Sequence, residues 1–202
     1  MTNKIEQFGK KLAEKIGPEK IFAAEGQIIA KPASVTEVVE VIKTAREEDV
    51  PFAPGRYTVG PAHPPAAEPE LIISLENMGN IHQADLPESC LLAEPAALRR
   101  AVAETAAARG FYFPGEKCPH QLPTVGESAA ACYLNGDPHF LCSDTCLCGL
   151  ELVSFDGEIV TAGGPCVVEL DSYSLTYVLG GQSKGPAVIT GIYLKLFPAQ
   201  EV

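Results

Sequence analysis

The sequence predicts an α+β domain of two interleaved lobes, and three observations lead to that prediction. A strand–helix–strand unit precedes residue 55, and a hairpin with a long β-branched strand lies near the C-terminus. The chain has 202 residues, 46% of them apolar, which is enough for one substantial core. No internal repeat or linker divides it. We therefore expect a single domain over residues 1–202, with an N-terminal helix in residues 1–18, lobe one over about residues 20–85 and lobe two over about residues 86–202.

The first lobe follows from helix signals and short apolar runs. Apolar residues at helical spacing predict a helix over residues 3–16, which Gly17-Pro18 ends. Ser34 and Glu37 form a capping box that begins a helix reaching about Glu48. The apolar face of this second helix consists of Val35, Val38, Val39 and Ile42. The strands expected here are residues 27–30, 50–54 and 71–75.

The second lobe is predicted from the same kinds of signal. Helix propensity covers residues 96–109, with Gly110 after the end, and Thr124 is a candidate N-cap for a short helix ending near Tyr133. Asp156-Gly157 predicts a type I′ turn in a hairpin. The expected strands are residues 90–93, 150–155, 158–161 and 187–196. The expected solvated face of the longer helix consists of Arg99, Arg100, Glu104 and Arg109.

Composition excludes several classes of function. A net charge of −11 argues against a nucleic-acid partner, because phosphate backbones are bound by a surplus of Lys and Arg. No apolar run approaches the roughly 20 residues that span a bilayer, and the N-terminus lacks the apolar region of a signal peptide. We therefore expect a cytoplasmic protein without a membrane span, in which an odd number of cysteines (seven) does not form a disulfide framework.

Several segments in a fixed order give the first indication of function. Residues 54–69 form a long loop rich in Gly, Pro and Ala without a hydrophobic period, which makes it a functional candidate. With its flanking segments, this loop resembles the FAD-binding domain of the vanillyl-alcohol-oxidase and glycolate-oxidase (PCMH-type) family. The segments that carry the resemblance are residues 29–32, the helix after Ser34, and residues 50–58, 71–81, 90–95, 110–114, 124–126, 149–160 and 181–198.

The resemblance implies a small strand–helix–strand lobe, a larger mainly antiparallel lobe, and FAD held non-covalently between them. The pyrophosphate would lie against residues 54–60 and 124–126, and the flavin ring near residues 181–189. The positions that the resemblance assigns to the cofactor are Pro54, Gly55, Arg56, Tyr57, Thr58, Gly60, Thr124, Val125, Gly126, Ser128, Gly181, Val188 and Ile189.

Three cofactor-facing segments depart from the family pattern. Gly55-Arg56-Tyr57-Thr58 replaces a run rich in glycine, and residues 181–187 replace a Gly-Ser-Glu-Gly-Thr-Leu-Gly segment. Glu127 stands where the family has a second glycine, and its carboxylate would compete with the pyrophosphate for the same N–H groups. Two like charges about 4 Å apart repel by roughly 4 kcal/mol at an effective dielectric constant of 20. Two interpretations stay open: an FAD-binding module, and a cofactor-free scaffold with the same fold in a redox complex.

The resemblance also implies an activity and a kind of partner. The first interpretation predicts a subunit or module of an FAD-linked oxidoreductase acting on a 2-hydroxy acid, similar to glycolate and lactate oxidases, with hydride transfer to flavin N5. No catalytic residue is identified in the chain, and no substrate or cap domain is expected in it. A second subunit would supply the substrate domain or iron–sulfur clusters.

Cysteines and one histidine give two further ligand hypotheses. Cys142, Cys146 and Cys148 could offer thiolates to zinc or a cluster, but the run lacks the Cys-x-x-Cys spacing, and core packing is the favoured interpretation. Covalent flavin attachment through His63, Cys132 or Cys142 is a minor alternative, because none of them has the Gly-His context of such attachment.

Overall fold

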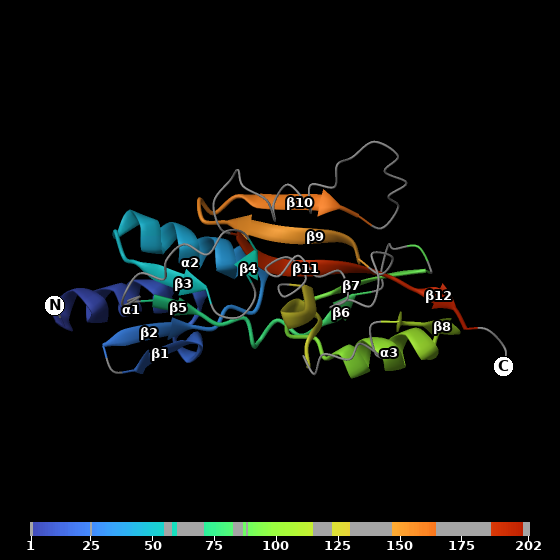
Figure 1. The fold of residues 1–202 in the computed structure, drawn as a ribbon. Coiled ribbons are helices and arrows are strands. Elements are labelled where there is room, and N and C mark those ends of the chain that lie inside the picture. Colours follow the sequence, from blue (N-terminus) through green and yellow to red (C-terminus); the bar gives the residue numbers. More distant parts are fainter. Residues whose placement is uncertain are drawn as a thin grey trace.

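The protein is described from a computed structural model of the 202-residue chain. The described residues are 2–24, 26–54, 58–59, 71–82, 87, 89–114, 123–129, 147–164 and 187–199. They form two larger sheets side by side, flanked by helices, and a separate two-stranded sheet (Figure 1). The mixed helix and sheet architecture predicted from the sequence is confirmed.

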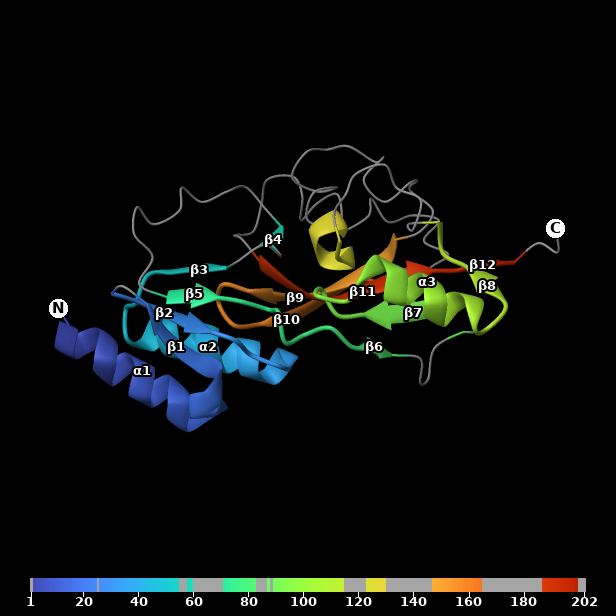
Figure 2. The same ribbon diagram turned by 90° about the horizontal axis from the view of Figure 1, so that it is seen from below.

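The first sheet has four strands in the order β1 (Ile21–Ala24), β2 (Gln27–Ala30), β5 (Leu71–Ile73) and β3 (Phe52–Pro54). β2, β5 and β3 run parallel, and β1 pairs antiparallel with β2. α1 (Thr2–Ile16) and α2 (Val35–Glu47) lie along one side of this sheet (Figure 2). A 3-10 turn, Pro18–Lys20, connects α1 to β1. The predicted strand–helix–strand lobe is present.

The second sheet is antiparallel, with the order β10 (Ile159–Gly163), β9 (Leu147–Ser154), β11 (Ala187–Lys195), β7 (Cys90–Ala93) and β6 (Ile81–His82). A further strand, β4 (Thr58–Val59), pairs with the beginning of β11. α3 (Arg99–Ala107) lies beside a two-stranded unit of β8 (Phe111–Tyr112) and β12 (Phe197–Pro198). β4 and β6 fall in the range expected for lobe one but belong to the sheet of lobe two, so the lobes interleave more deeply than their sequence ranges suggest.

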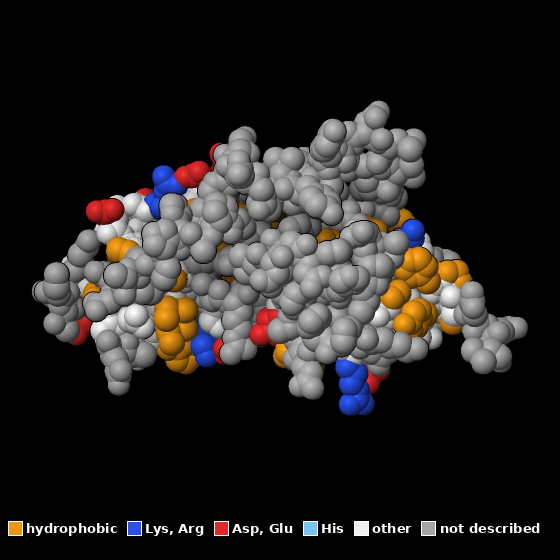
Figure 3. All heavy atoms as spheres, viewed as in Figure 1, with side chains coloured by type: hydrophobic (Ala, Val, Ile, Leu, Met, Phe, Trp, Pro, Cys, Tyr) orange, Lys and Arg blue, Asp and Glu red, His pale blue; other side chains and the backbone are white. Residues whose placement is uncertain are grey.

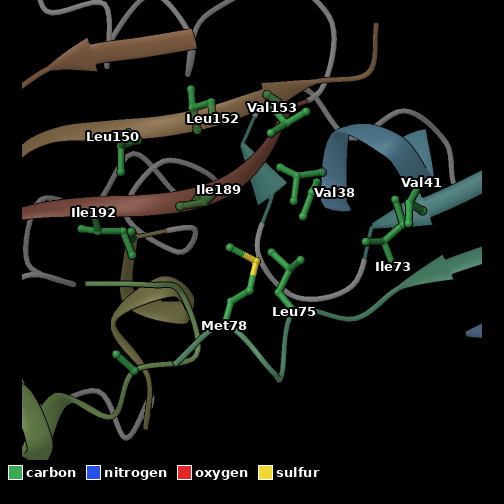
Figure 4. Packing of buried hydrophobic residues seen from close by; sticks show 14 of the residues in the cluster. Val38, Val41, Ile73, Leu75, Met78, Leu150, Leu152, Val153, Ile189 and Ile192 are labelled. Atoms are coloured by element: carbon green, nitrogen blue, oxygen red, sulfur yellow. The ribbon is translucent and has the colours of Figure 1, made fainter. Parts of the chain in front are cut away.

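One hydrophobic core joins the two sheets. Val38 and Val41 of α2 and Ile73 of β5 belong to the same buried cluster as Val153 of β9 and Ile189 of β11 (Figure 4). All five of these side chains are fully buried. Because each sheet contributes to this cluster, each lobe buries apolar surface that it would expose alone.

A smaller apolar surface remains at the end of the molecule that carries α3, β8 and β12 (Figure 3). Tyr112 is 36% exposed, and two cations lie over neighbouring rings. The Arg109 guanidinium is 5.8 Å from the Phe111 ring centroid, and Lys195 Nζ is 5.3 Å from that of Phe197. Such cation–π contacts partly cover rings that are not in the core.

α2 begins at the predicted Ser34 and Glu37, with Ser34 as the N-cap and the Glu37 side chain bonded to the residue before Ser34. The Ser34 hydroxyl accepts a hydrogen bond from the Glu37 N–H at 3.3 Å, and Glu37 Oε2 accepts one from the Ala33 N–H at 2.9 Å. Lys20 Nζ donates to Glu37 Oε1 at 2.6 Å. The buried face is rotated from the expected one, because Val38 and Ile42 are joined by Val41, whereas the expected Val35 and Val39 are only partly buried.

α3 is shorter than the predicted helix over residues 96–109. It begins at Arg99, because the preceding residues bond to a distant segment: Leu98 forms a bridge with Thr124, and the Val125 N–H donates to the Ala97 carbonyl. Arg99, expected on the solvated face, is only 7% exposed, so that expectation was wrong for this residue. A tertiary contact has overridden local helix propensity.

The hairpin turn also differs from its prediction. A type I′ turn needs positive φ at both central residues. Gly157 has a φ of 76°, but the φ of Asp156 is not positive. The Gly157 N–H instead donates to the Ser154 carbonyl, and the Ser154 N–H donates to the Glu158 carbonyl. The connection is therefore a three-residue loop in which only the glycine is left-handed.

Candidate flavin site

The two lobes meet where the predicted phosphate loop begins. β3, in the first sheet, ends at Pro54, and β4, in the second sheet, starts at Thr58. Thr58 is the register partner of Val188, and Val59 is that of Ala187. The structure thus brings three predicted positions, Pro54, Thr58 and Val188, to one junction. The other expected positions of these segments lie outside the described residues, and they are Gly55, Arg56, Tyr57, Gly60 and Gly181.

Val188 and Ile189 position this junction through their own packing. Both side chains are buried, at 1% and 0% exposure, and β11 is held between β9 on one side and β4 on the other. Their side chains belong to the hydrophobic core. These two residues would therefore act on a cofactor indirectly, by holding β11 in position.

The second expected segment begins a helix, described over residues 125–129, which Thr124 caps. The Thr124 hydroxyl accepts a hydrogen bond from the Glu127 N–H at 3.2 Å and donates one to Glu127 Oε2 at 3.1 Å. The Ser128 hydroxyl, only 1% exposed, donates to the Thr124 carbonyl at 3.0 Å. The expected N-cap is confirmed, and the Glu127 carboxylate folds back onto it.

The backbone donors of this turn are already used within the chain. The Val125 N–H donates to the Ala97 carbonyl at 3.0 Å, and the Gly126 N–H donates to the Pro95 carbonyl at 3.0 Å. The next two N–H groups, of Glu127 and Ser128, bond the side chain and the carbonyl of Thr124. Residues 125–128 therefore present no spare N–H group to a pyrophosphate.

Gly126 has a packing reason of its own. A Cβ atom at this position would lie 2.5 Å from the Pro95 carbonyl oxygen and 2.7 Å from the Pro95 Cα. Real Cβ atoms do not approach backbone so closely, so only glycine allows this turn to lie against residue 95. The close approach of these two segments of the chain therefore requires glycine at a position that the family resemblance assigns to the cofactor. Its Pro95 partner is 31 residues away, and only the fold reveals it.

These observations test how well the described residues fit FAD. The crossing from β3 to β4 fits, because it carries the expected phosphate loop from one lobe to the other. The turn at residues 125–128 fits as a wall of the site, but it does not supply backbone donors. The beginning of α2 is closed in the same way, because the Glu37 carboxylate lies there and accepts hydrogen bonds from Lys20 and from the Ala33 N–H. Burial would raise the pKa of Glu37, but these two hydrogen bonds lower it overall. Donors for the phosphates must therefore come from other residues.

A second polar arrangement, between β9 and β11, has no signal in the sequence. Tyr193 of β11 donates a hydrogen bond from its hydroxyl to Glu151 Oε1 of β9 at 2.8 Å. Partial burial and this carboxylate raise the pKa of Tyr193 to about 12. Gly191 leaves room for the Glu151 side chain, since a Cβ there would lie 2.8 Å from Glu151 Oε2. Only the strand register, which places Gly191 opposite Glu151, reveals this pair.

The metal alternative gains no support within the described ranges. No group of three or more His, Cys, Asp or Glu side chains that could hold an ion occurs there. Cys148 lies half-buried on β9, whereas Cys142 and Cys146 are outside the described residues. The same holds for the covalent-attachment candidates His63, Cys132 and Cys142. No helix of the described part is long and apolar enough to cross a membrane.

Comparison with known families decides the identity of the fold. A domain family described as "FAD binding domain" matches residues 26–163, more than half of the chain. The chain belongs to this family. The FAD-binding fold and the cofactor expected from the resemblance are therefore confirmed at the level of the family.

Three curated relatives of this FAD-binding domain are also similar along most of the chain. The D-lactate dehydrogenase of Archaeoglobus fulgidus is 28% identical over 183 residues, covering 87% of this chain and 40% of that protein. An uncharacterized FAD-linked oxidoreductase of Mycobacterium tuberculosis is 29% identical over 84% of this chain and 37% of that protein. The glycolate oxidase subunit GlcD of Bacillus subtilis is 22% identical over 86% of this chain and 37% of that protein. The chain therefore spans about two fifths of the length of these relatives.

Solved structures of low identity share the fold. The 4-ethylphenol oxidase from Gulosibacter chungangensis superposes with a TM-score of 0.68 and 15% identity, over 97% of this chain and 43% of that one. p-Cresol methylhydroxylase gives a TM-score of 0.69 and 14% identity, over 100% of this chain and 45% of that one. At this identity the match shows the arrangement of the FAD-binding domain, with its antiparallel sheet and helices.

Proposed function

We propose that this FAD-binding domain serves an oxidoreductase that oxidises a 2-hydroxy acid of the lactate or glycolate class. The observation that carries the proposal is a similarity running through both lobes to a D-lactate dehydrogenase and to a glycolate oxidase subunit. When bound, FAD would supply the acceptor for the substrate hydride. The chain's own contribution would be to bind and orient the cofactor.

We assign the cofactor to the junction of the lobes. The loop between Pro54 and Thr58 would approach the phosphates, and Arg56 would supply positive charge in place of the missing glycine N–H groups. The turn at Thr124–Gly126 would form a rigid wall, because its donors are already bonded. Residues 181–189 would lie near the flavin ring, as the family resemblance implies. The substrate-facing side would come from a further domain or a second subunit, with an iron–sulfur protein as one candidate.

FAD titration tests the first half of this proposal. Bound FAD must stabilise the native state, by about 2.7 kcal/mol at a concentration of 100 Kd. We expect quenching of flavin fluorescence and a rise in Tm on addition of FAD, and a weaker response in Arg56→Ala. Arg100→Ala is the matched control, because Arg100 is 84% exposed on α3 and pairs only locally with Glu104 in the interactions described. A chain that binds no FAD would support the cofactor-free scaffold instead.

Substrate specificity is tested separately on the FAD-loaded protein, together with any partner that copurifies. We expect anaerobic bleaching of the flavin by D- or L-lactate or by glycolate, and none by succinate, which lacks the hydroxyl group. In the presence of the domain or subunit that covers the substrate side, FAD binding without bleaching by any 2-hydroxy acid would contradict the substrate assignment while leaving the cofactor assignment intact.

A further inference from the structure

The turn between β9 and β10 reaches from the second lobe onto the first. Phe155, the residue after β9, places its ring against that of Phe52 on β3, with the ring centroids 4.8 Å apart and the ring planes at 50°. A tilted pair at this separation is a favourable aromatic arrangement. Both side chains are partly buried against the common core. The turn therefore contacts the strand that ends at Pro54, where the proposed phosphate loop begins.

A charged side chain of α2 fixes the same turn from a second direction. Arg46 Nη1 donates a hydrogen bond to the Phe155 carbonyl at 3.2 Å, and the Arg46 guanidinium also forms an ion pair with Asp156. Gly157 lies close to the same helix, since a Cβ there would be 2.8 Å from Lys43 Cγ. Figures 1 and 2 both show this end of the hairpin beside α2. Exposed ion pairs contribute little energy, so Arg46 mainly sets the direction of the turn and the ring contact holds it.

The far end of the proposed phosphate loop is connected to the same turn through the second sheet. Val59 of β4 is the register partner of Ala187 on β11, and Ala187 is also the register partner of Ser154, the last residue of β9. Ser154 directly precedes Phe155, and its hydroxyl and carbonyl oxygens accept hydrogen bonds from the N–H groups of residues 156–158. Adjacent residues on three neighbouring strands therefore lead from the turn to β4.

We propose that Phe155 is a positioning residue for the cofactor, which holds the two ends of the phosphate loop, Pro54 and Thr58, in a fixed relation to each other. This role rests on the proposed function, which assigns the cofactor to the same junction. β3 is an edge strand that pairs only with β5 among the described strands, so the ladder restrains it on one side. The contact between Phe52 and Phe155 adds a restraint from the other lobe. Phe155 therefore acts through Phe52 and needs no contact with the cofactor itself.

A restraint of this kind affects the affinity for FAD. A loop whose ends are already held loses less conformational entropy when it binds a ligand. If the ends are correctly placed in only a fraction of the molecules, the apparent Kd rises by the inverse of that fraction. The energy of one aromatic pair corresponds to about a 2- to 12-fold change in such an equilibrium. Loss of the Phe155 ring should therefore weaken FAD binding by this factor in a protein that remains folded.

The first test compares FAD affinities at a temperature at which every variant is folded. Phe155→Ala and Phe52→Ala should each raise the Kd for FAD by about 2- to 12-fold. The double variant should lose less than the product of the two single losses, because both substitutions remove one contact. Phe22→Ala is the matched control, since this ring is 44% exposed on β1 at the opposite edge of the same sheet, beneath Lys31. It should leave the Kd unchanged. An unchanged Kd in Phe155→Ala, or fully multiplicative losses in the double variant, would contradict the proposal.

Amide hydrogen exchange of the FAD-free protein gives a readout that does not depend on the cofactor. In Phe155→Ala, the amides of β3 and β4 should exchange faster than in the original chain, and by a larger factor than those of β7, which report global unfolding. If only residues 154–158 exchange faster, the turn does not hold the ends of the loop and the proposal is wrong. An original chain that binds no FAD, together with the expected exchange in Phe155→Ala, would overturn the cofactor assignment and support the restraint on the two strands.

Discussion

Gly126→Ala separates a packing role of this glycine from a phosphate-binding role. The new Cβ would lie 2.5 Å from the Pro95 carbonyl oxygen, so the turn must move away from residue 95. Overpacking of this kind costs about 1–3 kcal/mol, and weakening the Gly126 N–H bond to Pro95 adds about 1 kcal/mol. The better helix propensity of alanine returns about 1 kcal/mol. We expect the free energy of unfolding to fall by about 1–3 kcal/mol, which lowers Tm by about 2–12 °C in a chain of this size.

The assay is urea denaturation of the FAD-free protein, followed by circular dichroism. Gly79→Ala is the matched control, because a Cβ there would approach the same chain segment at an ordinary 3.7 Å from the Ala96 carbonyl. It should change the free energy of unfolding by less than about 0.5 kcal/mol. A phosphate-binding glycine would behave differently: its replacement would lower FAD affinity and leave the FAD-free protein unchanged. If Gly126→Ala unfolds at the same urea concentration as the original chain, the packing argument fails.

Three further predictions concern polar contacts. Tyr193→Phe should cost about 1 kcal/mol of stability at pH 7, since the hydrogen bond to Glu151 is lost. Because the pKa of folded Tyr193 is raised to about 12, its protonation contributes stability below pH 10 that disappears between pH 10 and 12. Urea midpoints across that range should therefore fall more in the original chain than in Tyr193→Phe, and parallel curves would contradict this. Glu37→Gln should flatten the acid side of the stability profile, because the lowered pKa of Glu37 gives stability above pH 4.5 that is lost as the pH falls through the folded pKa. If calorimetry shows the same loss of stability at acidic pH in Glu37→Gln and in the original chain, Lys20 does not lower the pKa of Glu37. Thr124→Ala should cost about 1 kcal/mol by removing the cap of the short turn, whereas Thr124→Ser should retain most of it, and equal unfolding midpoints for the two variants would count against the cap.

Local sequence signals predicted most of the regular elements. The capping residues Ser34 and Thr124 and the strand at residues 71–73 are where the sequence places them, because cap chemistry and short apolar runs act over a few residues. The family resemblance, which rested on a collinear series of segments, predicted the architecture and is confirmed.

The deviations have a common physical cause in contacts between distant segments. Leu98 is withdrawn from the helix expected over residues 96–109 by its bridge to Thr124. Arg99 is buried by the same docking. The Glu151–Tyr193 bond depends on strand order, which no local pattern encodes. Gly126, which the family resemblance assigns to the cofactor, also makes a close backbone approach to Pro95 that the sequence does not reveal.

The two residues of β4 have a consequence for how this protein can be divided. Thr58 and Val59 lie among the residues of the parallel sheet in the sequence, yet they hydrogen-bond to the final long strand more than a hundred positions later. A fragment ending before residue 86 would carry this strand away from its partner, and the complementary fragment would expose the flank of β11 beside it. We therefore regard the halves as inseparable by simple truncation. Engineering that aims to shorten or recombine this domain should keep both ends of that long-range ladder in the same polypeptide.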